Sequence, residues 1–220
     1  MNIFKTENSY LRNQPINSSF TRLQTEDACG QDMAEFVVAI TGASSAIHGK
    51  RLVEVLCELG HQVLLVVSDA GRLTLAHECN ATPEELAEIN GVHLEDNADI
   101  GARSASGSAK IDGVIICPCS GTTIGKIANG ISDNLVTRSA VVAMKERRKL
   151  IIVPRESPYA TVHLELMAKL SGYGVVVLPA SPGYYNHPKS MDELVDFIIA
   201  RILDQLGLEH SIGKRWEGLN

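Results

Sequence analysis

An arginine and a glutamate stand directly behind a short apolar run near position 150. The run Leu150–Val153 ends in Pro154, and Arg155 and Glu156 follow at once. Four aliphatic residues in succession are typical of a strand that is buried on both faces of a parallel sheet. The carboxyl edge of such a sheet is where open α/β proteins bind ligands. A guanidinium at that edge can bind an anion, and a carboxylate there can move a proton.

Further cations along the chain could serve the same anion. Arg138 and Lys145 are seven residues apart, which is two turns of the helix predicted over residues 134–147, so both lie on one face. Tyr185 and Arg201 add a hydroxyl and a second guanidinium farther along. If the fold brings these residues together, they would suit a phosphorylated ligand.

Three further turns at predicted strand ends carry hydroxyl groups, namely Gly42–Ser45, Ser68 and Ser120–Thr123. Hydroxyls and free amides at the start of a helix can hold a phosphate or a cofactor. Serine and threonine also cap helices in many proteins without any ligand. Taken alone, these turns are compatible with both interpretations.

The stretch Thr41–Ala46 looks like the opening of a short-chain dehydrogenase, in which glycines let the backbone approach a dinucleotide. Ala46 and His48 occupy the places of the later glycines. A Tyr-x-x-x-Lys pattern occurs at Tyr185–Lys189, but Pro188 prevents the smooth helical turn that would align its two side chains. The nicotinamide interpretation is therefore not favoured.

The composition limits the function classes. The chain has 220 residues, 45% of them apolar and 21% charged, as expected for one globular domain with a sizeable core. The net charge of −6 argues against general binding of nucleic acid, which needs a basic surface. No apolar run reaches the roughly 18 residues of a membrane span, so no membrane association is expected.

The five cysteines are scattered, and Cys117 and Cys119 form the only close pair. A zinc site would need a second pair, so no metal is predicted. An odd, scattered set of cysteines favours reduced thiols, and hence a cytoplasmic protein.

Strands and helices alternate along most of the chain. The expected strands are 36–41, 62–67, 113–117, 150–153 and 175–178. The expected helices are 46–59, 71–78, a short one opened by Thr82–Glu85, 124–128, 134–147, 160–170 and 191–206, whereas 91–110 is expected to be irregular. This alternation predicts an α/β fold with a doubly wound parallel sheet between two layers of helices. Residues 1–35, rich in Asn, Ser, Thr and Gln, are expected to form a flexible extension, and 36–220 a single domain.

The order and spacing of many segments resemble the UbiX-type flavin prenyltransferases from about Phe36 to Trp216. The segments are Thr41–Ser44, Ser68, Glu78, Ala105–Ser108, Cys117–Ser120, Lys145–Arg148, Pro154–Glu156, Pro179–Tyr185, Ala200–Leu203 and Arg215–Trp216. The main departure from the family is Ser45, where family members often have glycine.

The resemblance implies a flavodoxin-like, Rossmann-like fold that binds FMN. Members of this family join dimethylallyl phosphate to reduced FMN, at N5 and then at C6, without a metal. The product, prenylated FMN, is the cofactor of UbiD-type decarboxylases. The family forms homo-oligomers, commonly dodecamers, with sites at subunit junctions.

The resemblance also implies a role for each matching residue. The expected FMN contacts are Gly42, Ala43, Ser44, Ser68, Ser120, Gly121, Thr122, Thr123 and Arg155. The expected catalytic residues are Glu156, as acid–base group, with Lys145, Tyr185, Arg138 and Glu78. The expected contacts to the prenyl phosphate are Lys145, Tyr185, Arg201, Ser106 and Trp216, with Ser106 on a loop that reaches a neighbouring subunit.

Two other functions remain open at this point. The first is an FMN-dependent cysteine decarboxylase of the phosphopantothenoylcysteine decarboxylase type, although Cys117–Ser120 replaces the Pro-Ala-Ser-Ala-Asn-type loop of those enzymes. The second is a non-enzymatic carrier that delivers flavin to a decarboxylase.

Overall fold

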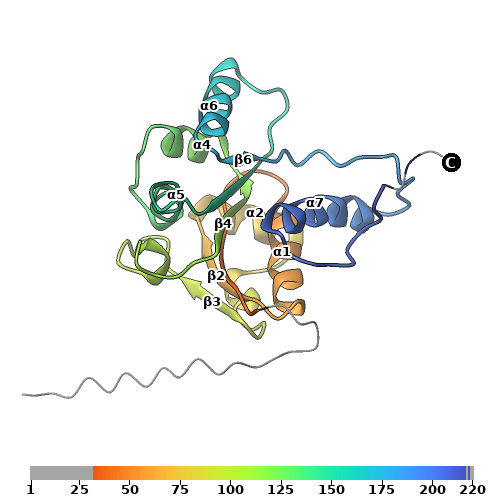
Figure 1. Cartoon of the computed structure of the whole chain (residues 1–220), viewed down its shortest axis with the longest axis horizontal. Helices are drawn as coiled ribbons and strands as arrows, with labels where there is room; N and C mark the ends of the chain where they lie inside the picture. The colour runs from red at the N-terminus through yellow and green to blue at the C-terminus, as the bar shows by residue number, and fades with distance from the viewer. Residues whose placement is uncertain (1–31, 217, 219–220) are drawn as a thin grey trace, which may run out of the picture. The chain divides into compact units, whose positions relative to one another are not determined.

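The computed structural model describes residues 32–216 and 218, in which six parallel strands lie between two layers of helices (Figure 1). The strands are β1 (Glu35–Ile40), β2 (Gln62–Val67), β3 (Val92–Glu95), β4 (Gly113–Cys119), β5 (Lys149–Pro154) and β6 (Val176–Val177). The α-helices are α1 (Ala46–Glu58), α2 (Asp69–Cys79), α3 (Pro83–Leu86), α4 (Gly121–Ala128), α5 (Leu135–Lys145), α6 (Thr161–Gly172) and α7 (Met191–Leu206). A 3₁₀ turn, η1, covers Arg103–Ala105.

The order of the strands across the sheet is β3-β2-β1-β4-β5-β6, and every neighbouring pair is parallel. The chain first builds outward from β1 to β3 and then returns to the other side of β1 with β4. The point between β1 and β4 is therefore a topological switch point, where ligands bind in open α/β sheets. The predicted doubly wound, three-layer α/β fold is confirmed.

Two buried clusters hold the layers together. Alternate residues of β1 point to opposite faces, so Val38 and Ile40 join the core under α1 and α7, whereas Val37 and Ala39 join the core under α4 and α5. All four side chains are inaccessible to solvent. Burial on both faces explains why the central strands read as continuous apolar runs.

Most of the predicted elements are present, and α7 has the predicted bounds. Gly60 follows α1 with φ of +84°, as expected of a glycine that ends a helix. The prediction that residues 91–110 are irregular is wrong for β3, which pairs with β2. β3 is an edge strand with an exposed His93, so its sequence lacks the apolar run that marks the central strands.

The flexible extension predicted for residues 1–35 lies outside the described residues up to position 31 and stays a prediction there. Within the described part of the chain, none of the helices is both long enough and apolar enough to cross a bilayer.

Gly49 tests how tightly α1 packs on the sheet. A Cβ at Gly49 would lie 2.3 Å from the carbonyl oxygen of Cys117 and 2.9 Å from Ile40 Cγ1. We expect Gly49→Ala to lower the free energy of unfolding by about 1–3 kcal/mol, because backbone and core must shift. Gly125→Ala is the matched control, since the nearest atom to its Cβ would be 4.0 Å away and alanine favours the helix by about 0.5–1 kcal/mol. Urea denaturation of both variants measures the difference, and equal stability of the two would contradict this packing.

Candidate functional site

One buried threonine joins the two turns at the switch point. The Thr41 hydroxyl donates to the carbonyl oxygen of Pro118 at 2.9 Å and accepts from the Ser120 amide at 2.9 Å. The Thr41 amide donates to the same Pro118 oxygen at 3.2 Å. The turn after β1 and the turn after β4 are thus held side by side, and we call this place the switch-point edge.

The switch-point edge offers backbone donors that have no acceptor. Gly121 and Thr122 open α4, so their amides have no acceptor inside the helix, whereas the Ser120 hydroxyl accepts from the Thr123 amide at 3.3 Å. Across the edge, the amides of Gly42 and Ser44 also lack an acceptor among the described residues. Four such donors beside the positive end of a helix suit an anionic or hydroxyl-rich ligand.

The start of α1 is closed, in contrast to that of α4. The carboxylate of Glu78, on α2, accepts from the amides of Ser45 at 2.8 Å and Ala46 at 2.9 Å through one oxygen. Ser45 stands at the N-cap position, but its side chain makes no capping hydrogen bond. The interpretation of this turn as serine-capped is therefore wrong: a carboxylate distant in sequence takes that role, and a ligand anion must use other donors.

Arg155 and Glu78 both act on Ser44. The Arg155 guanidinium donates through Nε to the Ser44 carbonyl oxygen at 3.1 Å. Burial alone would raise the pKa of Glu78, but hydrogen bonds from the Ser44 side chain and two amides, with the charge of Arg155, hold that pKa below its ordinary value. Glu78 is therefore an anion at neutral pH, and Arg155 offsets its charge at the switch-point edge.

The start of α2 packs against the turn after β1 at this edge. Ser68 caps α2 by accepting from the Gly71 amide at 3.1 Å, so its hydroxyl is partly engaged. A Cβ at Gly42 would lie 2.3 Å from the Cβ of Ala70. Glycine is required at this position because α2 approaches the turn so closely, whether or not a ligand is bound.

A second set of predicted residues lies at the opposite edge of the sheet. Lys145 ends α5, just before Lys149 opens β5, whereas Arg155 follows the other end of β5. Six residues of strand span roughly 20 Å. Lys145 forms an ion pair with Glu146, and Gly107 of the Ser106–Ser108 loop lies against both side chains.

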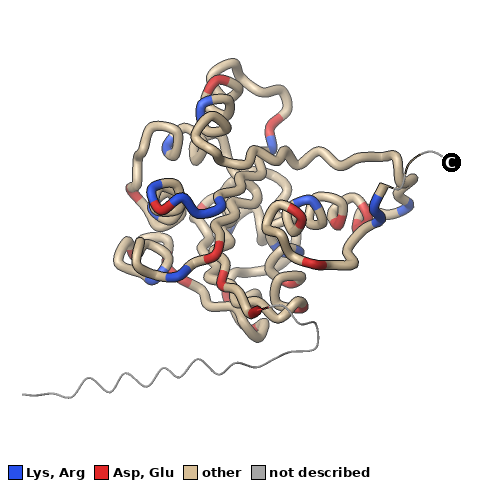
Figure 2. Tube along the Cα trace, in the orientation of Figure 1, with Lys and Arg blue, Asp and Glu red and all other residues tan. Residues whose placement is uncertain are grey.

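Positive charge is dense here: Lys145, Arg147, Arg148 and Lys149 flank Glu146 where α5 passes into β5, and Figure 2 shows this stretch largely in blue. Arg148 donates to the Gly107 carbonyl oxygen at 2.6 Å, which ties the Ser106–Ser108 loop to this run. Arg138 is exposed on α5, seven residues before Lys145.

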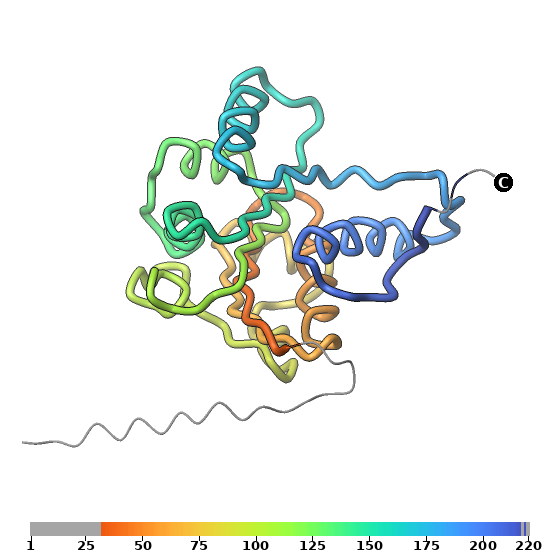
Figure 3. The backbone as a smooth tube through the Cα atoms, in the orientation of Figure 1, coloured from red at the N-terminus to blue at the C-terminus, as the bar shows by residue number. Residues whose placement is uncertain are grey.

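A third set gathers around α7. Tyr185 lies on the segment after β6, and its ring meets Phe197 of α7 at 5.8 Å and Trp216 at 5.2 Å, both edge to face. Asn186 donates to the Lys214 carbonyl oxygen at 2.9 Å. Figure 3 shows the segment before α7 and the segment after it running along this helix.

Arg201 of α7 is held by Asp204, which is the centre of a small network. Asp204 accepts from Arg201 at 2.6 Å, from Arg215 at 3.0 Å and from His210 Nε2 at 3.2 Å. The Ile212 amide donates to His210 Nδ1 at 3.2 Å, so the proton of a neutral His210 lies on Nε2 and faces Asp204. Asp204 thereby joins the predicted phosphate ligand Arg201 to the segment that carries Trp216.

The three sets do not meet within one chain. Among the described residues, no hydrogen bond, ion pair or aromatic contact links the switch-point edge to Lys145 or to the Tyr185 group. Glu156 is exposed next to Arg155, and the Ser157 amide donates to its Oε1 at 3.3 Å. The structure thus brings together Gly42–Ser44, Ser68, Glu78, Ser120–Thr123 and Arg155, with Glu156 beside them, and leaves the other predicted residues elsewhere.

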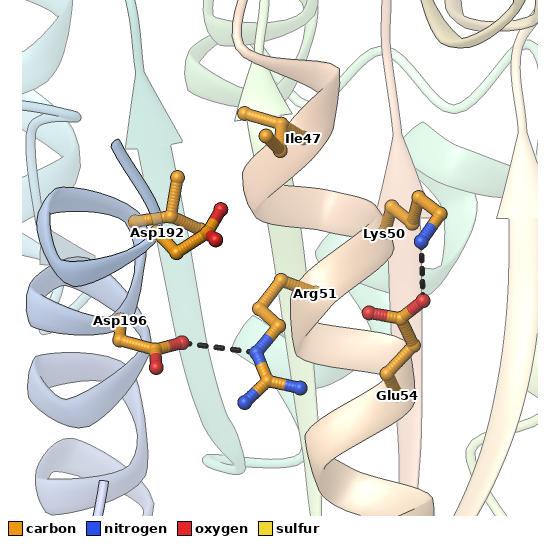
Figure 4. Close-up of a pocket in the computed structure, with 7 residues that line it drawn as sticks. Ile47, Lys50, Arg51, Glu54, Asp192 and Asp196 are labelled. Atoms are coloured by element: carbon orange, nitrogen blue, oxygen red, sulfur yellow. Dashed lines mark hydrogen bonds and ion pairs between the residues drawn. The ribbon is translucent and has the colours of Figure 1, made fainter. Parts of the chain in front are cut away.

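A pocket of about 320 Å³ lies away from all three sets, between α1 and α7 (Figure 4). Its walls carry the ion pairs Arg51–Asp196 and Lys50–Glu54, and it contains no predicted site residue. Within the described ranges, no three residues among His, Cys, Asp and Glu gather as metal ligands.

Several residues of the site escaped the sequence analysis. The hydrogen bonds of Thr41 join residues distant in sequence, and no local pattern signals them. The partners of Asp204 lie three to eleven residues away, but the sequence does not show that Arg201, His210 and Arg215 converge on this one carboxylate. His163 packs against Gly121, where a Cβ would lie 2.5 Å from its Nε2. The available signal was that Thr41 lies within one segment that resembles the family, Thr41–Ser44, and that Asp204 directly follows another, Ala200–Leu203.

Comparison with known proteins identifies related sequences and folds. Residues 26–203 match the Flavoprotein family. The flavin prenyltransferase UbiX of Thermoplasma acidophilum is 46% identical over 180 residues, which cover 82% of this chain and 98% of that protein.

Solved structures also resemble the chain. A dodecameric FMN-dependent UbiX-like decarboxylase from Escherichia coli O157:H7 has a TM-score of 0.81 and 40% identity, covering 84% of this chain and all of that one. AnUbiX (PadA1), in complex with FMN and dimethylallyl pyrophosphate, has a TM-score of 0.82 and 34% identity. The match covers 86% of this chain and 100% of that one. The cysteine decarboxylase TvaF, at 19% identity and a TM-score of 0.55, shares only the fold.

The closure of α1 by Glu78 predicts a dependence of stability on pH. Because the pKa of Glu78 is lowered in the folded state, its contribution is complete above the ordinary glutamate pKa near 4.5 and is lost as pH falls through the folded value. We expect Glu78→Gln to lower the melting temperature more at pH 7 than at about pH 3.5. Glu88→Gln is the control, since that carboxylate accepts no hydrogen bond among the described residues. A constant difference across the pH range would contradict the closure.

Proposed function

The chain belongs to the Flavoprotein family and, within it, to the UbiX-type flavin prenyltransferases, and on this premise we propose how its residues carry out the reaction. The enzyme joins the dimethylallyl group of a prenyl phosphate to reduced FMN, at N5 and C6, to give prenylated FMN. The observation that carries the assignment to this chain is the switch-point edge. Four amides there have no acceptor among the described residues and lie beside Arg155, at the place where such folds bind ligands.

The residues of the switch-point edge fit FMN. The amides of Gly121 and Thr122, at the positive end of α4, would bind the flavin phosphate or the ribityl hydroxyls. Gly42 and Ser44 would supply the donors on the other side, and Arg155 would add a guanidinium. Reduced FMN, when bound there, supplies the electron-rich N5 and C6 atoms that receive the prenyl group.

The remaining cations would hold the leaving phosphate. Lys145 and Arg201, with the Tyr185 hydroxyl, would stabilise the negative charge that grows as the allylic C–O bond breaks. Each such contact, if preorganised in a dry site, supplies about 2–4 kcal/mol. The Tyr185 ring already has a fixed place between Phe197 and Trp216. Arg138 and Ser106 would complete this half of the site.

Glu156 would move the proton. Closing the new ring at C6 requires the loss of a ring proton, and a base must take it. Glu156 follows Arg155 just after β5, so it stands at the carboxyl edge of the sheet where the flavin would bind. The released phosphate is the other group available for this step.

The active site would be shared among copies of the chain. Lys145 and Arg155 stand at opposite ends of β5 in one chain, so a site that contains both needs a second copy. Val162 and Leu164 on α6 are each 52% exposed, which favours an apolar contact between copies. A closed homo-oligomer, with Ser106–Ser108 and Lys145 entering a neighbour's site, meets both requirements.

The product would serve a UbiD-type decarboxylase, and the scattered thiols favour a cytoplasmic location; both remain predictions. The cysteine decarboxylase alternative has weaker support, because its solved members share only the fold with this chain. A flavin carrier would need none of the cations around α5 and α7.

A direct assay tests the reaction. With reduced FMN and dimethylallyl phosphate under anaerobic conditions, we expect a flavin heavier by one five-carbon unit in mass spectrometry. Glu156→Gln should slow the reaction at least about tenfold, as expected for loss of a general base, with FMN binding retained. Glu88→Gln should have no effect. Unchanged flavin, or turnover of 4′-phosphopantothenoylcysteine instead, would refute the assignment.

Mixed oligomers test whether the sites are shared. In an equal mixture of Lys145→Ala and Glu156→Gln subunits, a site built from two copies regains about a quarter of wild-type activity by random assortment. The Lys145→Ala/Glu156→Gln double variant, mixed equally with wild type, should then give the same quarter.

A site built within one chain predicts a different pair of results. The first mixture would show no recovery, and the second would retain half of the wild-type activity. Native mass spectrometry confirms that the subunits have exchanged before activity is compared.

A further inference from the structure

Ser45 adopts a backbone conformation that a residue with a side chain rarely adopts. Its φ is +107° and its ψ is +24°, in the region that glycine enters without cost. Such strain persists only where surrounding contacts hold it, and it gathers at functional sites. Ser45 directly follows Ser44, whose amide is one of the free donors of the switch-point edge.

His48 supplies the contact that holds Ser45. The Ser45 hydroxyl and His48 Nδ1 are 2.5 Å apart, and the His48 amide donates to the Ser45 carbonyl oxygen at 3.0 Å. His48 is 9% exposed, and burial lowers the pKa of its imidazole, an effect that a hydrogen bond with the Ser45 backbone and the charge of Glu78 partly offset. A neutral, buried imidazole has few rotamers available, so it fixes the direction of the Ser45 side chain.

Glu78 and Arg155 also restrict the backbone of this turn, each from another side. Glu78 accepts from the Ser45 amide at 2.8 Å, and Arg155 donates to the Ser44 carbonyl oxygen at 3.1 Å. Ser44 and Ser45 are thus held by α1, by α2 and by the residue that follows β5. The Ser44–Ser45 peptide has its carbonyl oxygen bound on one side and its amide bound on the other.

We propose that Ser45 and His48 are a positioning pair that presets the flavin-binding turn of this enzyme. The pair acts through Ser44 and does not itself carry out chemistry. This inference rests on the proposed function, since the ligand whose binding it assists is FMN. A rigid turn binds its ligand without first losing conformational freedom, so the pair contributes to FMN affinity.

Ser45→Gly separates positioning from stability. Glycine adopts φ of +107° without strain, so the melting temperature of the flavin-free variant should equal or exceed that of the wild type. The turn loses its hydrogen bond to His48 and gains freedom, so FMN should bind about tenfold more weakly, as expected for one lost hydrogen bond. At saturating FMN, the rate of prenylation should stay within about twofold of wild type.

Changes at His48 provide the matched tests. His48→Ala should weaken FMN binding as Ser45→Gly does, and the double variant should be no weaker than either, because all remove one interaction. His48→Asn, whose amide can reach the Ser45 hydroxyl, should restore most of the affinity. Ser171→Gly, at an exposed position on α6, should leave FMN affinity unchanged.

The outcomes distinguish the pair from the function itself. Wild-type affinity in Ser45→Gly, or additive losses in the double variant, would overturn the positioning role. A loss of affinity that only follows a lowered melting temperature would assign the pair a structural role and overturn it too. If the wild-type protein binds no FMN, the proposed function fails, and this is seen before any variant is compared.

Discussion

The bridge formed by Thr41 is the interaction on which the candidate site depends. Thr41 and Pro118, which follow β1 and lie near the end of β4, are 77 residues apart in the chain, yet the carboxyl ends of these strands must form one ligand-binding edge. The Thr41 hydroxyl donates to the Pro118 carbonyl oxygen and accepts from the Ser120 amide. Thr41 itself is only 1% exposed. The hydroxyl gives the Ser120 amide its acceptor and gives the Pro118 oxygen a second donor beside the Thr41 amide. The edge is therefore fixed before any ligand arrives.

The two helices that start at this edge have divided roles. Glu78 accepts from the amides of Ser45 and Ala46 at the start of α1, and its carboxylate would repel a ligand phosphate placed there. The first amides of α4 have no such partner, and Arg155 counters the charge of Glu78 from across the edge. Electrostatics thus favour an anion near Gly121 and Thr122. The sequence marked the turns after β1 and β4 alike as possible anion sites, whereas the structure favours the second.

The alternation of apolar runs and amphipathic segments was enough to predict the layers, the central strands and even the bounds of α7, because burial dictates these patterns. It missed β3, since an edge strand of four residues carries little burial. The turns after β1 and β4 were predicted as ligand-binding from their residue types, but the role of Glu78 was not. Its carboxylate reaches amides more than thirty residues away, and only tertiary packing decides which turn a carboxylate meets. Asp204 was missed although its partners are near in sequence, because the segment after α7 must fold back before His210 and Arg215 reach it.

The position of Lys145 follows from the order of the elements around β5. A strand that begins after a helix and ends at a ligand-binding turn necessarily places the end of that helix at the far edge of the sheet. No movement of side chains spans the length of β5, so Lys145 and Arg155 cannot serve one ligand within one copy. If both residues are needed, as the family membership leads us to propose, then the fold itself requires assembly for activity. The positive charge of Lys145, at the amino edge of the sheet, would then act in the active site of a neighbouring copy. The exposed apolar residues Val162 and Leu164 of α6 would form part of the contact between the copies.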